Sequence, residues 1–272
     1  MHTTRILLLA ATFAFPLAVR AEATLFIYPT LVLFEDNQRS AEITIANRGD
    51  QTGTFETSWT DLAMAPAGGL VKAEGEVPWS VQPHVRYSPR RVTLAPGESQ
   101  VIKIAVRPNP EIAEGEYYSH LRVLTINSED PLAVDAALDD PEPSPGVSIQ
   151  ARTAVAIPVI WRNSRETPSM SIEAVRTDAD ANTVSIDVRR HGLLSARGYL
   201  HLMETAPDRS LRPLADAAPV VIYPNLDART ITVELYDGAA VDSLSPSAGV
   251  YYSADSVLTE RSTVLAQFPI VP

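Results

Sequence analysis

Five histidines and thirty-three carboxylates are the residue types that could do acid-base or metal chemistry. The histidines are His2, His84, His120, His191 and His201. None belongs to an HExxH motif, and the pair His191 and His201, ten residues apart, has no carboxylate at ligand spacing. The sequence therefore predicts no metal site and no cofactor.

The sequence lacks the motifs that contain the usual nucleophiles of covalent catalysis. The chain has no cysteine, no serine in a GxSxG elbow and no glycine-rich phosphate loop. Four methionines, one of them the initiator, do not make a methionine-rich copper site. Acidic residues distant in sequence could still meet as a catalytic pair, but nothing singles out two of them. We therefore expect the protein not to be an enzyme.

Composition limits the remaining classes of function. The chain has 272 residues, of which 45% are hydrophobic, so it is long enough for two domains with separate cores. Its net charge of -11 argues against general nucleic-acid binding, which needs clustered Lys and Arg. Without cysteine, stability must come from packing and not from disulfides.

The first 21 residues have the pattern of a secretory signal peptide. Arg5 precedes an apolar run over residues 6–18, and small residues offer cleavage after Ala21 or Ala23. The run is shorter than the ~20 apolar residues that a membrane span needs. We expect an exported mature chain without a membrane span.

The strand period dominates the mature sequence, which predicts an all-β protein. The first half alternates over about seven segments separated by turn signals such as NRGD and APGES, which suits an immunoglobulin-like sandwich. The expected strands there are 25–34, 40–47, 53–61, 84–89, 99–108, 116–126 and 146–162. Residues 161–169 suit a linker, and a second, smaller sandwich is expected after it, with strands in 171–178, 182–190, 196–206, 218–224, 229–237 and 257–271.

The segment GVSIQARTAVAIPVIWR, residues 146–162, carries a mostly apolar row at every second position. That row consists of Val147, Ile149, Ala151, Thr153, Val155 and Ile157. The segment follows an acidic connection, residues 127–145, with six carboxylates and no basic residue. Such long connections are commonly functional or disordered, so this one is either a solvated tether or a segment that becomes ordered on a partner.

Two longer stretches carry a family resemblance. VQPHVRYSPRRVTLAPGESQVIKIAVRP followed by EGEYYSHLRVL resembles the PapD-like periplasmic chaperones of pilus and fimbria assembly. LFIYPTLVLF is similar to the first strand of that family, and VSIQARTAVAIPVIWR to the last strand of its first domain. The resemblance covers most of residues 24–162 and the second half only weakly.

The resemblance implies a fold, a location and a mechanism. Two immunoglobulin-like β-sandwich domains in tandem would form a boomerang in the periplasm, with the signal peptide at 1–21 and the domains at 22–162 and 163–272. The last strand of the first domain would complete a pilin-like or coat-like subunit by donor-strand complementation. Val147, Ile149, Ala151 and Thr153 would fill the subunit's groove, before delivery to an outer-membrane usher. Alternation alone is equally compatible with these residues filling the protein's own core.

The sequence departs from the family at the carboxylate anchor. Relatives hold the subunit's terminal carboxylate between an arginine and a lysine, where this chain has Leu31 and either Ala154 or Ala156. Arg152 shares strand parity with both alanines and could supply a cation or simply be an exposed residue. Glu116 and Arg162 match family positions that form an interdomain ion pair, and exposed pairs of this kind stabilise by under ~1 kcal/mol.

Two other classes of function remain open. A structural or adhesive protein could use two sandwiches as a scaffold, and a monomer with a complete first domain and no subunit partner would favour it. A carbohydrate-active or metal enzyme could also use such a scaffold, and a bound sugar or metal would support it.

Overall fold

The computed structural model describes residues 23–35, 37–107, 109, 111–126, 153–206, 209–259 and 261–271. The described elements of the first half are β1 (Leu25–Tyr28), β2 (Val32–Phe34), β3 (Ser40–Asn47), β4 (Gly53–Thr60), β5 (Leu62–Met64), β6 (Leu70–Lys72), the 3-10 turn η1 (Gln82–His84), β7 (Val85–Ser88), β8 (Arg91–Leu94), β9 (Ser99–Val106), β10 (Gly115–Ile126) and β11 (Ala154–Asn163). Those of the second half are β12 (Ser169–Asp178), β13 (Thr183–His191), β14 (Ala196–Thr205), β15 (Leu211–Pro213), β16 (Ala218–Ile222), β17 (Ala228–Glu234), the 3-10 turn η2 (Val241–Ser243), β18 (Gly249–Ser253) and β19 (Val264–Pro269).

The first half is a sandwich of two sheets. One sheet has the strand order β1-β3-β9-β7, and the other has the order β2-β11-β10-β4-β8. All pairs in them are antiparallel except β2 with β11, which is parallel. The all-β prediction and the sandwich are confirmed.

Alternation explains why these segments become strands. In β3, Ile43 and Ile45 are fully buried, while Glu42 is exposed and forms an ion pair with Lys103 of β9. In β9, Ile102 and Ile104 point to the same core. A pleated segment with one apolar face can therefore bury that face between the sheets and leave the other in water.

The expected single strand at 25–34 is wrong, because the chain crosses between the sheets there. A cis peptide joins Tyr28 to Pro29, β1 pairs with β3, and β2 pairs with β11 in the other sheet. A second cis peptide, Ser88–Pro89, separates β7 from β8 in the same way. Proline cannot donate to a ladder, which suits a point where pairing must stop.

The second half is also built from two sheets. One is β12-β13-β17, and the other is β15-β14-β18-β19 with β16 pairing along part of β14. Apolar residues of both sheets form its core, including Ile186, Leu200 and Val250. The sequence prediction missed β15 and β18 and expected the last strand to be longer than β19.

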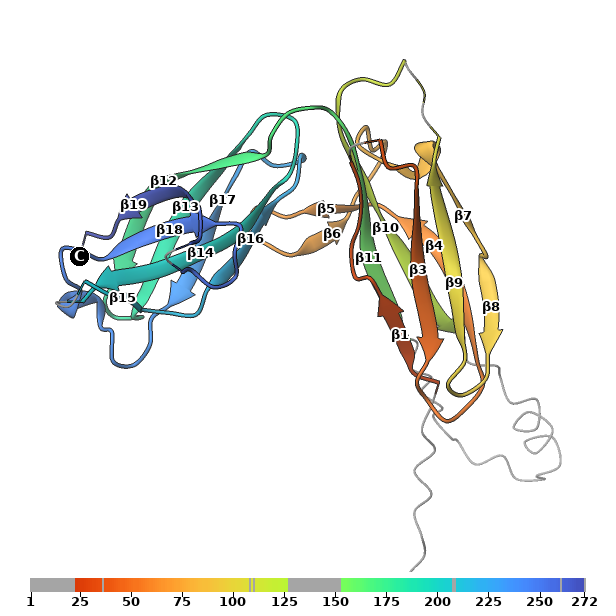
Figure 1. Ribbon diagram of the computed structural model, residues 1–272, viewed down its shortest axis with the longest axis horizontal. Helices are drawn as coiled ribbons and strands as arrows, with labels where there is room; N and C mark the ends of the chain where they lie inside the picture. Colours follow the sequence, from red (N-terminus) through yellow and green to blue (C-terminus); the bar gives the residue numbers. More distant parts are fainter. Residues whose placement is uncertain are drawn as a thin grey trace, which may run out of the picture.

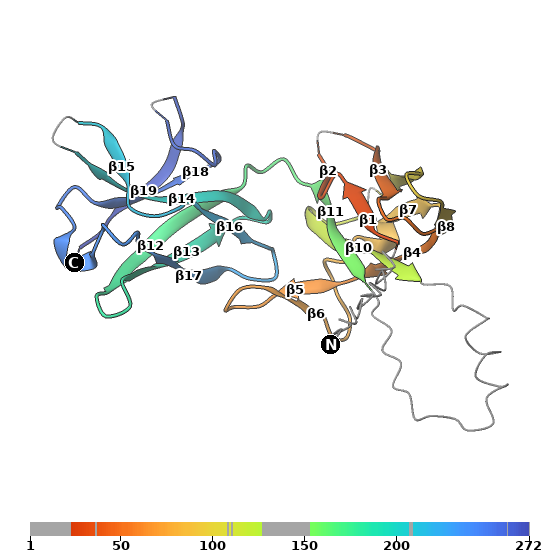
Figure 2. The same cartoon turned by 90° about the horizontal axis from the view of Figure 1, so that it is seen from below.

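The two sandwiches form elongated lobes set at an angle and joined by the segment between β11 and β12 (Figure 1). A short hairpin, β5 and β6, extends from the first lobe toward the second, as the turned view shows (Figure 2). This hairpin was not expected from the sequence. It brings residues near Met64 against the loop that follows β16.

Candidate functional site

The candidate site begins at one edge of β11. Along its whole length, Ala154–Asn163, this strand pairs with β10. On its other edge, β2 pairs only with Val159, Ile160 and Trp161. Between Ala154 and Pro158, no strand of the described part of the chain pairs with that second edge. An unpaired edge is a template for a strand from another chain.

The side chains of β11 divide between the two faces of its sheet. Val155 and Ile157 pack in the core of their own sandwich, so these two side chains of the apolar row fill the protein's own core. Ala154 and Ala156 are exposed on the opposite face. Thr153 is exposed and precedes the strand, and its carbonyl accepts a hydrogen bond from the Thr125 amide at 3.0 Å. Val147, Ile149, Ala151 and Arg152, like the acidic segment 127–145, lie outside the described residues.

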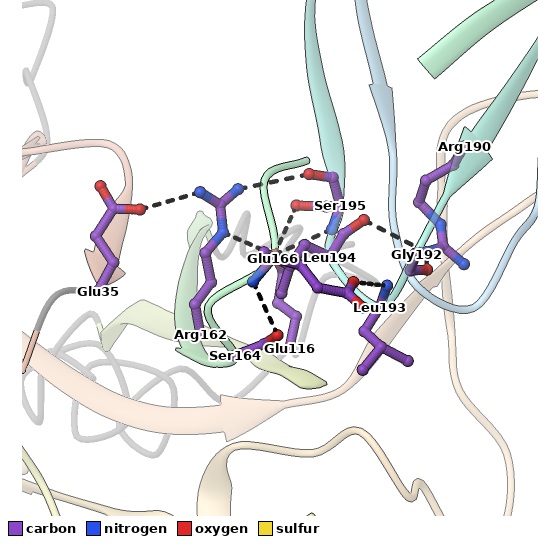
Figure 3. A network of polar contacts seen from close by, with 10 residues as sticks. All are labelled: Glu35, Glu116, Arg162, Ser164, Glu166, Arg190, Gly192, Leu193, Leu194 and Ser195. Carbon is purple, nitrogen blue, oxygen red and sulfur yellow. Dashed lines mark hydrogen bonds and ion pairs between the residues drawn. The ribbon is translucent and has the colours of Figure 1, made fainter. Parts of the chain in front are cut away.

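Arg162, at the far end of β11, links three segments of the chain (Figure 3). Its Nε donates to Oε2 of Glu116 at 3.1 Å, and its Nη1 donates to Oε2 of Glu35 at 3.0 Å. Its Nη2 donates to the carbonyl of Ser195 in the second sandwich at 3.4 Å. The same Glu116 oxygen accepts from the amide of Ser195 at 3.1 Å and from its hydroxyl at 2.9 Å.

The expectation of an exposed pair here is wrong. The Glu116 side chain is 0% exposed and that of Arg162 is 12% exposed. β10 and β11 place them directly opposite each other, and Ser195, just before β14, hydrogen-bonds to both of them. A buried charge is costly unless it is paired and hydrogen-bonded. The buried pair of Glu116 and Arg162 therefore favours the arrangement of the two sandwiches in which Ser195 completes its hydrogen bonds.

A series of stacked side chains crosses from one sandwich to the other. Trp79 stacks on Tyr118 with ring centroids 6.2 Å apart, and Tyr118 stacks on Tyr223 of the second sandwich at 4.7 Å. The guanidinium of Arg197 lies over the Tyr223 ring at 5.3 Å. Met64, Tyr118, Ile160 and Tyr223 form a buried cluster, which Leu31 and Leu33 flank.

His120 lies beside this stack on β10. It is 1% exposed, and neither ring nitrogen has a hydrogen-bond partner among the described residues. Burial lowers the pKa of His120 to about 4; Asp61 opposes this shift and Arg197 adds to it. Burial, together with Tyr223, Glu116 and Asp61, also raises the pKa of the Tyr118 phenol. His120 is therefore neutral near pH 7 and is enclosed at the boundary between the sandwiches.

Asn225 attaches the β5–β6 hairpin to the second sandwich. Its side-chain oxygen accepts hydrogen bonds from the Met64 amide at 3.2 Å and the Tyr118 hydroxyl at 2.9 Å. Its side-chain nitrogen donates to the Met64 carbonyl at 2.9 Å. One side chain thus satisfies three groups of the first sandwich across the domain boundary.

The positions of the expected carboxylate anchor hold no cation. Leu31 is half-buried against the apolar cluster between the sandwiches, and it directly precedes Val32, which pairs with Val159. Ala154 and Ala156 present only methyl groups on the exposed face of β11. Among the described residues, no group of three or more His, Cys, Asp or Glu side chains could hold a metal ion. None of the described helices is long and apolar enough to span a membrane.

No protein-family model and no curated protein matches the chain in sequence. Solved structures do match in fold. The crystal structure of the CsuC-CsuE chaperone-tip adhesion subunit pre-assembly complex, from the archaic chaperone-usher Csu pili of Acinetobacter baumannii, matches at 14% identity with a TM-score of 0.50. The match covers 90% of this chain and 99% of that one. The YadV chaperone matches at 12% identity with a TM-score of 0.47, over 90% of this chain and 98% of that one.

This chain has the fold of the fimbrial assembly chaperones. At the level of fold, the resemblance to PapD-like chaperones is confirmed, and so are the two immunoglobulin-like sandwiches.

Sequence reasoning missed most of the residues between the two sandwiches of this chaperone fold. Glu116, Tyr118 and His120 occupy alternate positions of β10 and face the second sandwich, a spacing that could have marked them as one row. Trp79, Arg197 and Asn225 come from loops and a strand far apart in sequence. No local pattern indicates that they meet.

Proposed function

We propose that this protein is a periplasmic chaperone that binds strand-deficient, pilin-like or coat-like fimbrial subunits by donor-strand complementation and delivers them to an outer-membrane usher. It acts by binding and not by catalysis, and residues 1–21 direct its export. Residues 22–162 form the domain that binds the subunit. Residues 163–272 form the second domain, and Glu116 and Arg162 set the orientation between the two.

The observation that carries this proposal is the edge of β11 between Ala154 and Pro158, which no described strand covers. A subunit strand added there would extend the sheet that contains β10 and β11. Val147, Ile149, Ala151 and Thr153 have the same strand parity as Val155 and Ile157, which already pack in the core. In a continued strand, these side chains would therefore face the same side as Val155 and Ile157, and a subunit strand added at the edge of β11 would enclose them in the subunit's groove. Each large apolar side chain so buried contributes on the order of 1.5 to 3 kcal/mol before ordering costs.

The experiment is coexpression of the exported chain with a small, secreted β-rich subunit encoded beside it, followed by copurification from the periplasm. The wild-type chain is expected to hold the subunit as a one-to-one complex. Ile149→Asp is expected to release it, because a buried, unpaired carboxylate would face the subunit's groove.

Leu265→Asp is the matched control, since Leu265 is an exposed apolar residue of β19 in the second sandwich. This control is expected to retain the subunit. Equal retention by Ile149→Asp and the wild-type chain would overturn the donor-strand mechanism. A stable wild-type monomer that captures no subunit would favour the structural or adhesive alternative.

A further inference from the structure

A groove lined by arginines and aromatic rings lies beside β4 and β7. Its volume is about 550 Å³, and its lining includes Trp59, Gln82, Arg86, Tyr87, Arg90 and Arg91. Trp59 and Tyr87 meet edge to face with their centroids 5.3 Å apart. The Arg90 guanidinium lies 5.6 Å from the centre of the Tyr87 ring. The groove therefore combines cationic and flat apolar surfaces.

The backbone that carries these arginines is held in place by Thr57 of β4. The Thr57 amide donates to the Arg90 carbonyl at 2.8 Å, and its hydroxyl lies 3.0 Å from the same oxygen and 3.2 Å from the Pro89 carbonyl. The Tyr87 hydroxyl donates to the Thr57 carbonyl at 2.9 Å. A site whose backbone is fixed in this way loses less conformational entropy on binding a ligand than a flexible site does.

The charge of this groove is opposite to that of the chain. The whole chain carries -11, whereas the groove lining contains three arginines and one carboxylate, Glu56. Glu56 lies 3.8 Å from Arg91, and both side chains are about half exposed or more. The side chains of Arg86 and Arg90 are exposed and make no ion pair with a described residue.

The groove is also separate from the open edge of β11. In the sheet order β2-β11-β10-β4-β8, two strands, β10 and β4, lie between β11 and β8. The groove is bounded by β7 and by the start of β8, which are terminal strands of the two sheets. Terminal strands offer backbone donors and acceptors to an extended peptide.

We propose that the groove formed by Arg86, Arg90, Arg91, Trp59 and Tyr87 is a docking site, separate from the edge of β11, which binds an acidic polypeptide segment of a partner protein. Carboxylates of the segment pair with the guanidinium groups, and an apolar side chain lies against the two rings. The inference does not depend on the proposed function.

The test uses a fluorescein-labelled peptide of alternating Glu and Phe and its Gln and Phe counterpart, titrated with the full-length mature protein. Wild-type protein is expected to bind the acidic peptide at least tenfold more tightly than the neutral one. Arg86→Glu combined with Arg90→Glu is expected to weaken acidic-peptide binding at least tenfold. The milder pair Arg86→Gln with Arg90→Gln is expected to weaken it less, and it provides a second readout if charge reversal disturbs folding.

The matched control is Arg107→Glu with Arg165→Glu, which makes the same change of net charge at two exposed arginines outside the groove. It is expected to bind the acidic peptide within twofold of wild type. Equal weakening by the control variant would overturn the proposal, and so would failure of wild type to distinguish the two peptides. Binding to anionic phospholipid vesicles without binding to the peptide would also overturn it in favour of a membrane surface.

Discussion

At the scale of single residues, the boundary between the sandwiches depends on a few buried polar groups. One carboxylate oxygen of Glu116 accepts three hydrogen bonds, two of them from Ser195 in the other sandwich. The family resemblance predicted Glu116 and Arg162 but not their burial, because burial depends on the turn before β14, which is distant in sequence. Trp79 and Arg197 had no sequence signal, because their role follows only from the contacts that surround them.

Because His120 is buried in its neutral form, we expect the folded protein to lose stability in acid. Its pKa is about 4 in the folded protein and about 6.5 when unfolded, so between these values the unfolded chain binds more protons. The free energy of unfolding is therefore expected to fall as the pH drops from about 6.5 to about 4, by up to about 3 kcal/mol from this group. Urea unfolding across this pH range measures it.

The variant His120→Phe isolates this contribution, because carboxylates also titrate in acid. The titratable or charged groups around His120 are Asp61, Arg197, Tyr118 and Tyr223, and all remain in the variant. The difference in unfolding free energy between wild type and variant is expected to change with pH below about 6.5 and to be constant above it. If the difference in unfolding free energy were the same at every pH, His120 would have the same pKa in the folded and unfolded protein, which would contradict the prediction.

At the scale of elements, period-two alternation predicted the long strands well and failed where pairing changes partner. Residues 40–47 were predicted with the bounds that the structure has. Residues 25–34 are apolar on both sides of Pro29 and Thr30 and were predicted as one strand, yet they form two strands in different sheets, because only the pairing partners reveal the crossing. β5 and β6 have three residues each, too few for a period to be recognised.

Asn225 is expected to hold the β5–β6 hairpin against the second sandwich. Asn225→Ala removes three hydrogen bonds to Met64 and Tyr118, so the hairpin is expected to detach from the second sandwich. Each bond contributes about 1 kcal/mol, which predicts a loss of about 1 to 3 kcal/mol in the hairpin's opening free energy. Amide hydrogen exchange over residues 62–72 measures it.

Tyr118→Phe is the graded comparison, because it removes only the hydroxyl bond and retains the ring stack. It is expected to speed exchange in the hairpin less than Asn225→Ala does. Unchanged exchange in Asn225→Ala would mean that the apolar cluster around Met64 alone holds the hairpin.

At the scale of the whole molecule, the two candidate binding surfaces differ in the physics of recognition. The edge of β11 offers backbone groups and apolar side chains, and the anchor positions beside it are Leu31, Ala154 and Ala156. The groove beside β7 offers three guanidinium groups. A partner that needs a cation to hold its carboxylate finds none at the anchor positions, and a partner with an acidic segment finds the groove on the far side of β10 and β4.

This difference predicts that the two surfaces respond to salt to different extents. Raising the ionic strength from about 0.05 M to about 0.5 M shortens the screening length severalfold and weakens interactions between exposed charges. The affinity of the acidic peptide for the groove is therefore expected to fall at least fivefold. The affinity of a strand-deficient subunit for the edge of β11 is expected to change less than twofold, because hydrogen bonds between backbones and apolar burial carry no net charge. Titration of both ligands into the same protein preparation at each ionic strength measures the contrast. A subunit complex that weakens as steeply as the peptide complex would mean that a cation, with Arg152 as the first candidate, anchors the subunit after all.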